Sequence, residues 1–379
     1  MAMNNVTCIE DLRILHRKRV PRAFFEYVDG GAYSEATLRA NRDDLERLGL
    51  RQRVMVDVSG IDLRTTILGT SFALPFGLAP IGLAGLQYPD GEIHACRAAI
   101  KAQIPFALST ASICSIEDVA REAGSPFWFQ LYAYKDTGFV RALIERAAAA
   151  NCSALIVTVD VPVFGQRHRD LKNGMSVPPR LTLRNAYDTL KRPGWLLGMM
   201  RTKRANLGNL AGHVEGKDNL ASLGAWAATQ LNPSLSWKDV DWIRGLWKGP
   251  IVIKGIMAPA DAREAVRSGA QGIVVSNHGG RQLDGAPSSI SALPAIVQEA
   301  GSEAEILFDG GVRSGQDVMR VLALGAKGCL IGRAYIHGLG AGGEAGVAKA
   351  IDIIARELAT TMALCGVRTI AEIGPQVII

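Results

Sequence analysis

The feature that most constrains this chain is an alternation of short apolar runs with longer segments of helical character. From residue 74 onward, stretches such as Thr137–Ala150 and Ala258–Ser268 carry the 3.6-residue apolar spacing of amphipathic helices. Between such stretches lie eight β-rich runs, Leu74–Leu78, Pro105–Leu108, Phe127–Leu131, Ala154–Val159, Pro250–Ile253, Gly272–Val275, Glu305–Phe308 and Gly328–Ile331. This pattern predicts a (β/α)8 TIM barrel of the α/β class, and a doubly wound parallel sheet is the alternative.

Polar residues and glycines follow nearly every run. They are Ala79-Pro80-Ile81-Gly82, Ser109-Thr110, Gln130 and Tyr132, Thr158 and Asp160, Lys254, His278 and Arg281, Asp309-Gly310-Gly311-Val312-Arg313, and Gly332-Arg333. Barrel enzymes gather their chemistry at the C-terminal ends of their strands, on the loops that lead into the helices. Because these strand ends form one chemically coherent set, the sequence favours the barrel over the open sheet.

A heptapeptide after the sixth run, Ser276-Asn277-His278-Gly279-Gly280-Arg281-Gln282, carries the clearest chemical signal. An imidazole accepts a proton near neutral pH. A guanidinium three residues later can grip a carboxylate through two parallel hydrogen bonds. The two glycines would let the backbone approach a ligand closely. The heptapeptide therefore predicts a base beside an anion clamp, and a glycine-rich surface turn is the alternative.

The last two strand ends suggest a phosphate site. Asp309-Gly310-Gly311 and Gly332-Arg333 combine exposed backbone N–H groups with two arginines, Arg313 and Arg333, next to predicted helix starts. Barrels commonly bind phosphate after the seventh and eighth strands. Each glycine pair could be only a turn, but the two together favour a phosphate-bearing cofactor.

These motifs resemble the FMN-dependent α-hydroxyacid dehydrogenases and oxidases. The resemblance runs from Phe24–Ala32 to Glu372, and it is most specific in S-N-H-G-G-R-Q-L-D and in D-G-G-V-R followed by G-R about twenty residues later. Asp29–Ser34 and Trp128–Tyr132 are most similar to the bacterial quinone-linked L-lactate dehydrogenases. The resemblance implies one FMN-binding barrel domain over residues 1–379.

The resemblance also implies roles for individual residues. His278 would be the base, with Asp160 stabilising its protonated form. The substrate carboxylate would bind Arg281, Tyr27 and Arg167, and its hydroxyl would bind Tyr132. Lys254 would lie beside the N1–C2=O edge of the flavin. The remaining cofactor-binding positions would be Ile81, Gly82, Ser109, Gln130, Thr158, Ser276, Asp309, Gly311, Arg313, Gly332 and Arg333.

The activity implied is FMN-dependent oxidation of an L-2-hydroxy acid, first L-lactate to pyruvate, with a membrane quinone as electron acceptor. (S)-Mandelate is the alternative substrate, because the small Ala111 leaves room for a larger side chain. Gly82, where glycolate oxidase has alanine, weakly favours a dehydrogenase over an oxidase. A different class, a non-redox isomerase or aldolase, would use the same phosphate site and a Schiff base at Lys254. Asp160 could also merely cap a helix. No metal site is expected.

The strand–helix pattern is interrupted by a long insertion after the fourth strand, at about residues 170–235. Its segment 178–204 contains Pro178 and Pro179, and residues 180–204 hold one acid, Asp188, and seven basic side chains: Arg180, Arg184, Lys191, Arg192, Arg201, Lys203 and Arg204. The net charge of residues 180–204 is therefore +6, which equals the net charge of the whole chain, so the remainder of the protein is nearly neutral. Because the positive charge is confined to this one segment, a nucleic-acid partner is not expected.

The same segment carries Trp195-Leu196-Leu197 and Met199-Met200, which suits an anionic membrane surface. The resemblance supports this interpretation and implies a peripheral protein on the cytoplasmic face of a bacterial inner membrane, in a homo-oligomer. An active-site lid or an oligomer contact is the alternative. The residues Met1–Val20 do not read as a signal peptide, and no apolar run reaches the about 18 residues of a membrane span. Six scattered cysteines suit a reducing compartment.

Overall fold

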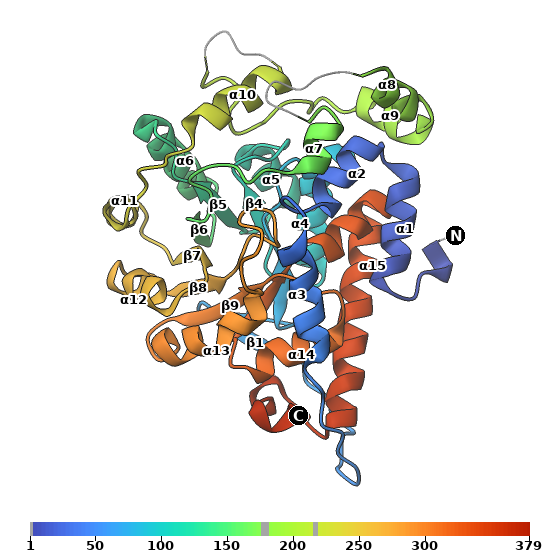
Figure 1. Cartoon of the computed structure of the whole chain (residues 1–379), viewed down its shortest axis with the longest axis vertical. Helices are drawn as coiled ribbons and strands as arrows, with labels where there is room; N and C mark the ends of the chain where they lie inside the picture. Colours follow the sequence, from blue (N-terminus) through green and yellow to red (C-terminus); the bar gives the residue numbers. More distant parts are fainter. Residues whose placement is uncertain (1–2, 176–181, 215–218) are drawn as a thin grey trace.

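A closed barrel of eight parallel strands forms the centre of the molecule (Figure 1). The computed structural model describes residues 3–175, 182–214 and 219–379. Strand β10 pairs with β9 and with β3, and a bridge between Leu78 and Phe106 joins β3 to the chain entering β4. Each predicted run overlaps one strand: β3 Phe76–Leu78, β4 Ala107–Ser109, β5 Trp128–Tyr132, β6 Ala154–Thr158, β7 Ile251–Ile256, β8 Gly272–Val275, β9 Glu305–Asp309 and β10 Gly328–Ile331. The barrel prediction is confirmed, and the doubly wound sheet is excluded.

A helix follows each barrel strand and covers the outside of the sheet. These helices are α4 Gly91–Lys101, α5 Ile116–Ala123, α6 Thr137–Ala149, α11 Trp237–Leu246, α12 Pro259–Arg267, α13 Ser289–Ala300, α14 Gly315–Ala323 and α15 Arg333–Cys365. Helix α15 is two helices that meet at a kink, where Gly342 and Gly343 leave helical geometry. Short 3-10 helices lie at Met3–Asn5, Ala84–Leu86, Ile370–Glu372 and Pro375–Val377.

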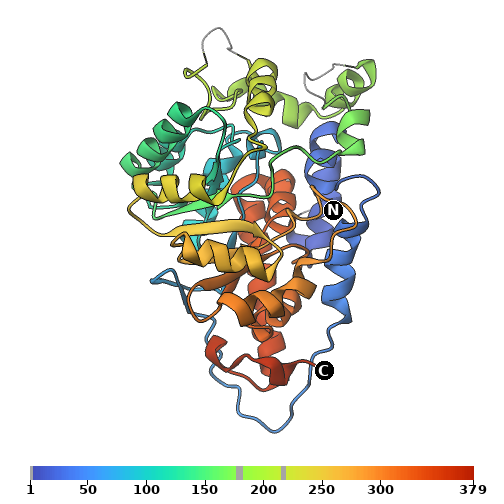
Figure 2. The ribbon, with the colours of Figure 1, turned by 60° about the vertical axis from the view of Figure 1, so that its left-hand side comes forward.

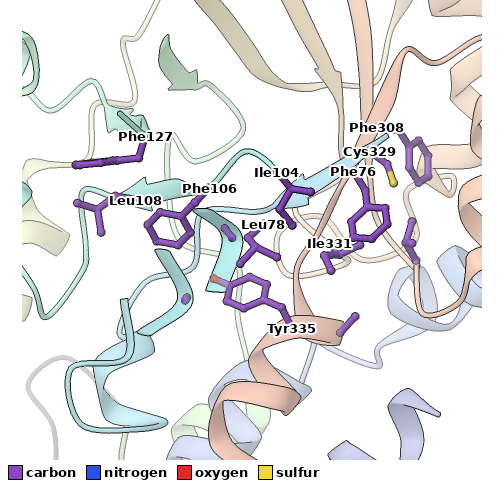
Figure 3. Packing of buried hydrophobic residues seen from close by; sticks show 14 of the residues in the cluster. Phe76, Leu78, Ile104, Phe106, Leu108, Phe127, Phe308, Cys329, Ile331 and Tyr335 are labelled. Atoms are coloured by element: carbon purple, nitrogen blue, oxygen red, sulfur yellow. The ribbon is translucent and has the colours of Figure 1, made fainter. Parts of the chain in front are cut away.

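The strands bury both faces, as parallel strands covered by helices must. Within β6, Leu155 and Val157 pack outward against the helices, while Ala154 and Ile156 point into the barrel. Figure 3 shows part of the outer layer, in which Phe76 and Phe308 lie among the helix-facing side chains. This two-sided burial explains why the strands appear in the sequence as continuous apolar runs.

Two features of the N-terminal part were not predicted. Helices α1 Ile9–Arg19, α2 Arg22–Asp29 and α3 Ala36–Arg47 precede the barrel, and α1 packs along α15. An antiparallel hairpin, β1 Thr65–Ile67 and β2 Thr70–Phe72, follows them. Ile67 belongs to the cluster that fills the barrel interior, and the hairpin's Phe72 contacts Trp128 edge to face. The hairpin thus covers the end of the barrel at which the strands begin.

The long insertion lies between β6 and α11, as predicted. It contains α7 His168–Lys172, α8 Leu183–Leu190, α9 Pro193–Arg201 and α10 Leu220–Gln230. Figures 1 and 2 both show α8, α9 and α10 together at one end of the molecule, remote from the C-terminus. Pro178, Pro179 and Arg180 lie outside the described residues. Among the described helices, none combines the length and the apolar character needed to cross a bilayer.

The two-layer core generates a stability prediction. Phe308 is fully buried between the sheet and the helices, so Phe308→Ala should leave a cavity and cost about 3–5 kcal/mol of unfolding free energy. Urea unfolding followed by circular dichroism measures this loss. Val54→Ala is the control, because Val54 is 72% exposed and should change stability by less than about 0.5 kcal/mol. Equal midpoints for the two variants would contradict this assignment of the core.

Candidate active site

One large cavity, with a volume of about 1300 Å³, lies over the C-terminal ends of the barrel strands. It exceeds the roughly 300–1,000 Å³ of ordinary ligand pockets, so it has room for more than a small acid. Most of the predicted site residues line it: Tyr27, Ile81, Gly82, Gln130, Tyr132, Thr158, Arg167, Lys254, His278, Arg281, Asp309, Gly311, Arg313, Gly332 and Arg333. The barrel thus brings together side chains that are up to about 300 positions apart in the sequence.

Three predicted residues do not line the cavity but hold residues that do. Ser109 donates its hydroxyl hydrogen bond to Oε1 of Gln130 over 3.0 Å. Ser276 accepts hydrogen bonds from the ammonium of Lys254, at 2.9 Å, and from the backbone N–H of His278, at 3.0 Å. Asp160 is the third, and its partner is the His278 ring.

The carboxylate of Asp160 orients the imidazole of His278. The distance from Nδ1 of His278 to Oδ1 of Asp160 is 2.9 Å. Because a carboxylate accepts, this contact places the proton of a neutral imidazole on Nδ1 and leaves the lone pair on Nε2. Asp160 caps no described helix, since the N-cap of the following helix α7 is Arg167. The interpretation of Asp160 as a helix cap is therefore wrong.

The electrostatic surroundings keep His278 neutral and Asp160 ionised. Burial lowers the pKa of His278 below its usual 6.5, and the nearby Asp160 only partly opposes this effect. Burial alone would raise the pKa of Asp160, but the interaction and hydrogen bond with the His278 ring and the positive charge of Lys254 bring it below its usual value. Near neutral pH the pair is thus a neutral base beside a carboxylate that stabilises a proton on it.

The two glycines of the heptapeptide make close contacts within the protein. His278, Gly279 and Gly280 all have positive φ, between 58° and 72°. A Cβ on Gly280 would lie 2.5 Å from the backbone nitrogen of Leu38, and one on Gly279 would lie 2.9 Å from Nη1 of Arg333. Although Gly279 also lines the cavity, the close approach that demands these glycines is to the protein itself.

Lys254 is a buried, fixed cation. Its ammonium lies 2.8 Å from Oδ2 of Asp309. Burial opposes the charge on Lys254, but Asp309 and Asp160 outweigh burial and raise its pKa. A protonated lysine is a poor nucleophile, so this environment disfavours the alternative in which Lys254 forms a Schiff base.

Three arginines on the cavity wall lack a carboxylate partner. Among the described residues, no carboxylate oxygen lies within ion-pair distance of Arg281, Arg313 or Arg333. Their guanidinium groups donate to backbone carbonyls instead, for example from Arg333 to Val28, Gly279 and Gly30.

Burial of these three arginines disfavours their charged forms. Burial, reinforced by a neighbouring arginine in each case, lowers the pKa of Arg281 and of Arg333 to about 9 and that of Arg313 to about 10. A buried cation without a partner is costly, so the cavity wall favours anionic ligands.

The cavity also presents polar atoms that fit a flavin nucleotide. Among the described residues, Nε2 of Gln130, Oγ1 of Thr158 and Oδ1 of Asp309 are buried and have no hydrogen-bond partner. Oε1 of Gln130 accepts from Ser109, which leaves its two N–H donors free. An amide donor, a hydroxyl and a carboxylate oxygen match ring carbonyls, a ring N–H and ribityl hydroxyls, and Arg313 and Arg333 match a phosphate. The residues present therefore fit FMN.

Several residues that build the site were not predicted. The side-chain amides of Asn41, on α3, and Asn277 form two reciprocal hydrogen bonds of 2.9 and 2.8 Å. Oδ1 of Asn277 also accepts from the N–H of Gly280 at 3.1 Å, so this amide pair holds the heptapeptide. The insertion contributes Leu190, Leu196, Leu207, Leu220, Leu231 and others to the cavity wall. No local signal in the sequence marks these positions, because their contacts are between distant segments.

The His278–Asp160 pair generates a prediction about reactivity. Acylation of His278 by diethyl pyrocarbonate should fall as the pH falls through a pKa below 6.5, because only the neutral ring reacts. Asp160→Asn should move this midpoint to lower pH, since it removes the charge that stabilises the imidazolium. Peptide mass spectrometry at several pH values measures the modification of each histidine. The exposed His168 is the control, and a midpoint at His278 that does not respond to Asp160→Asn would contradict the pairing.

Comparison with known proteins agrees with this geometry. The profile of the FMN-dependent dehydrogenases matches residues 16–379. A protein of Xanthobacter autotrophicus named L-lactate dehydrogenase is 48% identical over 371 residues, which cover 97% of this chain and 95% of that protein. A Pseudomonas syringae protein of the same name is 46% identical, over 99% of this chain and 98% of that protein.

Solved structures give the same result. The crystal structure of the monotopic membrane protein (S)-mandelate dehydrogenase superimposes with a TM-score of 0.95 at 35% identity and covers 99% of both chains. A mandelate oxidase bound to (S)-4-hydroxymandelic acid has a TM-score of 0.83 at 36% identity, over 97% of both chains. The fold, the cavity and the near full-length matches together show that this chain belongs to the family of FMN-dependent dehydrogenases, with FMN as its cofactor.

Proposed function

We propose that this enzyme oxidises an L-2-hydroxy acid, first of all L-lactate to pyruvate. The observation that carries the proposal is the neutral His278, held by Asp160, in the same cavity as the unpaired cation Arg281. A base and a carboxylate clamp are what the substrate's two functional groups require. L-Lactate is preferred because relatives with that name are 46–49% identical over nearly the whole chain.

Each substrate-binding residue has a role in this proposal. The carboxylate of the acid binds Arg281, whose guanidinium already stacks over the ring of Tyr27 at 4.9 Å. Arg167, which donates to the backbone oxygen of Arg281, reinforces the positive charge there. Burial raises the pKa of Tyr132, so its hydroxyl stays protonated and donates to the substrate oxygen.

His278 then removes a proton from the bound acid through Nε2. Asp160 stabilises the imidazolium that results, because its carboxylate lies against Nδ1. FMN, when bound, supplies the two-electron acceptor.

The remaining residues of the cavity would hold FMN. Gln130 and Thr158 offer their unpartnered atoms to the ring, with Ser109 fixing Gln130 and the backbone of Ile81 and Gly82 near N5. Lys254, held by Ser276, would stabilise negative charge at the N1–C2=O edge. The ribityl chain would bind Asp309, and the phosphate would bind Gly311, Arg313, Gly332 and Arg333.

(S)-Mandelate is the second candidate substrate. The support is the likeness to (S)-mandelate dehydrogenase in structure and the small side chain of Ala111, which lines the cavity beside Gly82. An aromatic ring needs the space that Ala111 leaves open. L-Lactate remains the preferred candidate, because the sequence is 48% identical to an L-lactate dehydrogenase but only 35% identical to the mandelate enzyme.

Anaerobic flavin reduction tests the reaction and the substrate together. The purified protein should be yellow and should bleach within seconds on mixing with L-lactate, more slowly with (S)-mandelate, and not with D-lactate. Stopped-flow absorbance across acids with longer side chains measures the preference. A protein that cannot be loaded with FMN, or that does not bleach with any 2-hydroxy acid, would refute the proposal.

Two variants separate the roles within this experiment. His278→Gln should retain FMN but bleach at least about 10²–10⁴-fold more slowly, since the base is lost. Arg281→Lys should mainly weaken substrate binding, because an ammonium cannot reproduce the two-pronged grip of a guanidinium. Normal bleaching by the His278 variant would contradict its assignment as the base.

We also propose that the enzyme rests on an anionic membrane surface through α8 and α9 and passes electrons to a membrane quinone. Exposed apolar side chains gather on these two helices: Leu183, Tyr187, Leu190, Leu197 and Met200. Exposed basic residues, Arg184, Lys191, Arg201 and Lys203, lie among or just beyond them. Apolar side chains flanked by basic ones are typical of segments that lie in the membrane interface. The monotopic mandelate dehydrogenase supports this placement, and the cytoplasmic face is part of the proposal.

Two residues that the sequence assigned to the membrane surface, Arg204 and Trp195, are engaged within the protein instead. Arg204 pairs with Asp90 at 3.0 Å and Asp118 at 3.1 Å, so its charge is used within the protein. Trp195 stacks on Phe24 and donates to the carbonyl of Leu86, which turns its ring towards the protein. Leu190 and Leu196 line the cavity as well, so the segment also covers the candidate active site, which keeps the lid alternative open.

Vesicle binding tests the membrane proposal. Replacing Arg201 and Lys203 with Gln together should weaken binding to vesicles rich in phosphatidylglycerol by about 30-fold, at roughly 1 kcal/mol per basic residue. Co-sedimentation at several salt concentrations measures it. Lys327→Gln is the control, because Lys327 is exposed but precedes β10 at the other end of the barrel. Unchanged binding of the double variant would refute this surface.

Two further expectations remain proposals. Leu207, Leu210 and Leu223 of the insertion belong to the same buried cluster as the barrel helices, which supports a single domain over residues 1–379. The homo-oligomer remains a prediction, and the molar mass of the purified protein in solution would check it.

A further inference from the structure

We propose that Asn209, in the link between α9 and α10, is a positioning residue for the flavin site. The inference rests on the proposed function only for its kinetic consequence. Asn209 belongs to the insertion, yet its side chain is fully buried at the end of β4. It holds the turn Ser109–Ser112, hereafter the β4 turn, in which Ala111 lines the cavity and Ser109 holds Gln130.

The amide of Asn209 is fully used in this contact. Nδ2 donates to the carbonyls of Ser109 and Thr110, both at 3.2 Å, and to the hydroxyl of Ser112 at 3.0 Å. Oδ1 accepts from the backbone N–H of Ile116 at 2.8 Å. Because the N–H of Ile116 can only donate, it fixes which end of the amide faces the turn. One side chain thus ties three residues of the β4 turn to the first residue of α5.

The backbone around Asn209 fastens the same turn. The N–H of Gly208 donates to the carbonyl of Ser112 at 3.1 Å. A Cβ on Gly208 would lie 2.6 Å from the oxygen of Ile113, so only glycine permits this approach. On the other side, Arg146 of α6 donates to the carbonyl of Asn209 at 2.8 Å. The segment Leu207–Leu210 is therefore a clip, anchored at several points, between the insertion and the barrel.

The position of the β4 turn fixes residues that are proposed to contact the flavin and the substrate. The hydroxyl of Ser109 orients Gln130, whose free N–H donors face the cavity. The carbonyl of Ala111 accepts from the N–H of Leu83 at 2.9 Å, and a Cβ on Gly82 would lie 3.3 Å from that of Ala111. A shift of the turn would misplace the amide offered to the flavin ring and would change the gap between Gly82 and Ala111. Asn209, which touches neither ligand, acts through these residues.

Two variants of Asn209 test the inference. Asn209→Asp keeps the acceptor for Ile116 but removes the donors and sets a carboxylate against two carbonyls. Asn209→Ala removes both functions. Each should bind FMN at least about tenfold more weakly, the fold-change expected when buried polar partners are left unsatisfied. Fluorescence titration of the apoprotein with FMN measures this affinity, and the visible spectrum of the bound flavin should shift.

The kinetic readout separates positioning from stability. In fully FMN-loaded protein, kcat/KM for L-lactate should fall at least about tenfold in both variants, since the flavin and the substrate no longer meet correctly. Asn219→Ala is the matched control, because the side chain of Asn219 caps α10 in the same insertion and, among the described residues, hydrogen-bonds only the backbone N–H of Ser222. It should lower the melting temperature without changing FMN affinity.

The outcomes are distinct. Normal FMN affinity and an unchanged flavin spectrum in both Asn209 variants would overturn the inference, even if their melting temperatures fell. Because the FMN titration needs no substrate, it stands whether or not lactate is the acid oxidised. If neither variant folds, Ser112→Ala removes one of the acceptors of Asn209 and should weaken FMN binding by a smaller factor. An unchanged affinity there would also overturn the inference.

Discussion

The closed ladder of parallel strands is the constraint on which the rest of this structure depends. Once β10 pairs with β3 and β3 contacts the chain before β4, every strand must end at the same rim. Closure therefore gathers the polar residues that follow the strands at this rim. The insertion covers the rim and encloses these residues. Lys254 and Asp309 meet at 2.8 Å for this reason, although more than fifty residues separate them.

Burial at that rim creates an imbalance of charge. Arg281, Arg313 and Arg333 are enclosed without a carboxylate partner among the described residues, and the cost of burying them lowers their pKa values. Burial lowers the pKa of His278 as well, so its ring stays neutral and keeps a free lone pair. The same physical cause thus prepares the cavity for anions and for proton removal. A phosphate and a carboxylate are the charges that would relieve it.

The insertion is joined to this chemistry more closely than its surface position suggests. Its outer helices expose apolar and basic side chains, whereas Leu190 and Leu196 line the cavity and Asn209 fastens the β4 turn. One segment therefore carries exposed apolar and basic side chains on its outside and also completes the wall of the cavity. A protein in which this insertion is shortened would need to retain the clip Leu207–Leu210, because Asn209 within it holds the β4 turn.

The sequence by itself determined the fold class, the eight strands and most of the strand-end residues that line the cavity, because strand burial and strand-end chemistry are local patterns. It also identified the pairing of His278 with Asp160, through resemblance. It missed the β1–β2 hairpin, the amide pair of Asn41 with Asn277, and Asn209. It assigned Arg204 to a surface that its ion pairs with Asp90 and Asp118 rule out.

Only the tertiary structure decided these contacts, since each joins segments that no periodicity relates. It also decided which parts of the protein the glycines after His278 accommodate, namely Leu38 and Arg333. A local sequence pattern indicates which residues are buried and which are chemically reactive. The residue that each of them contacts depends on the path of the whole chain.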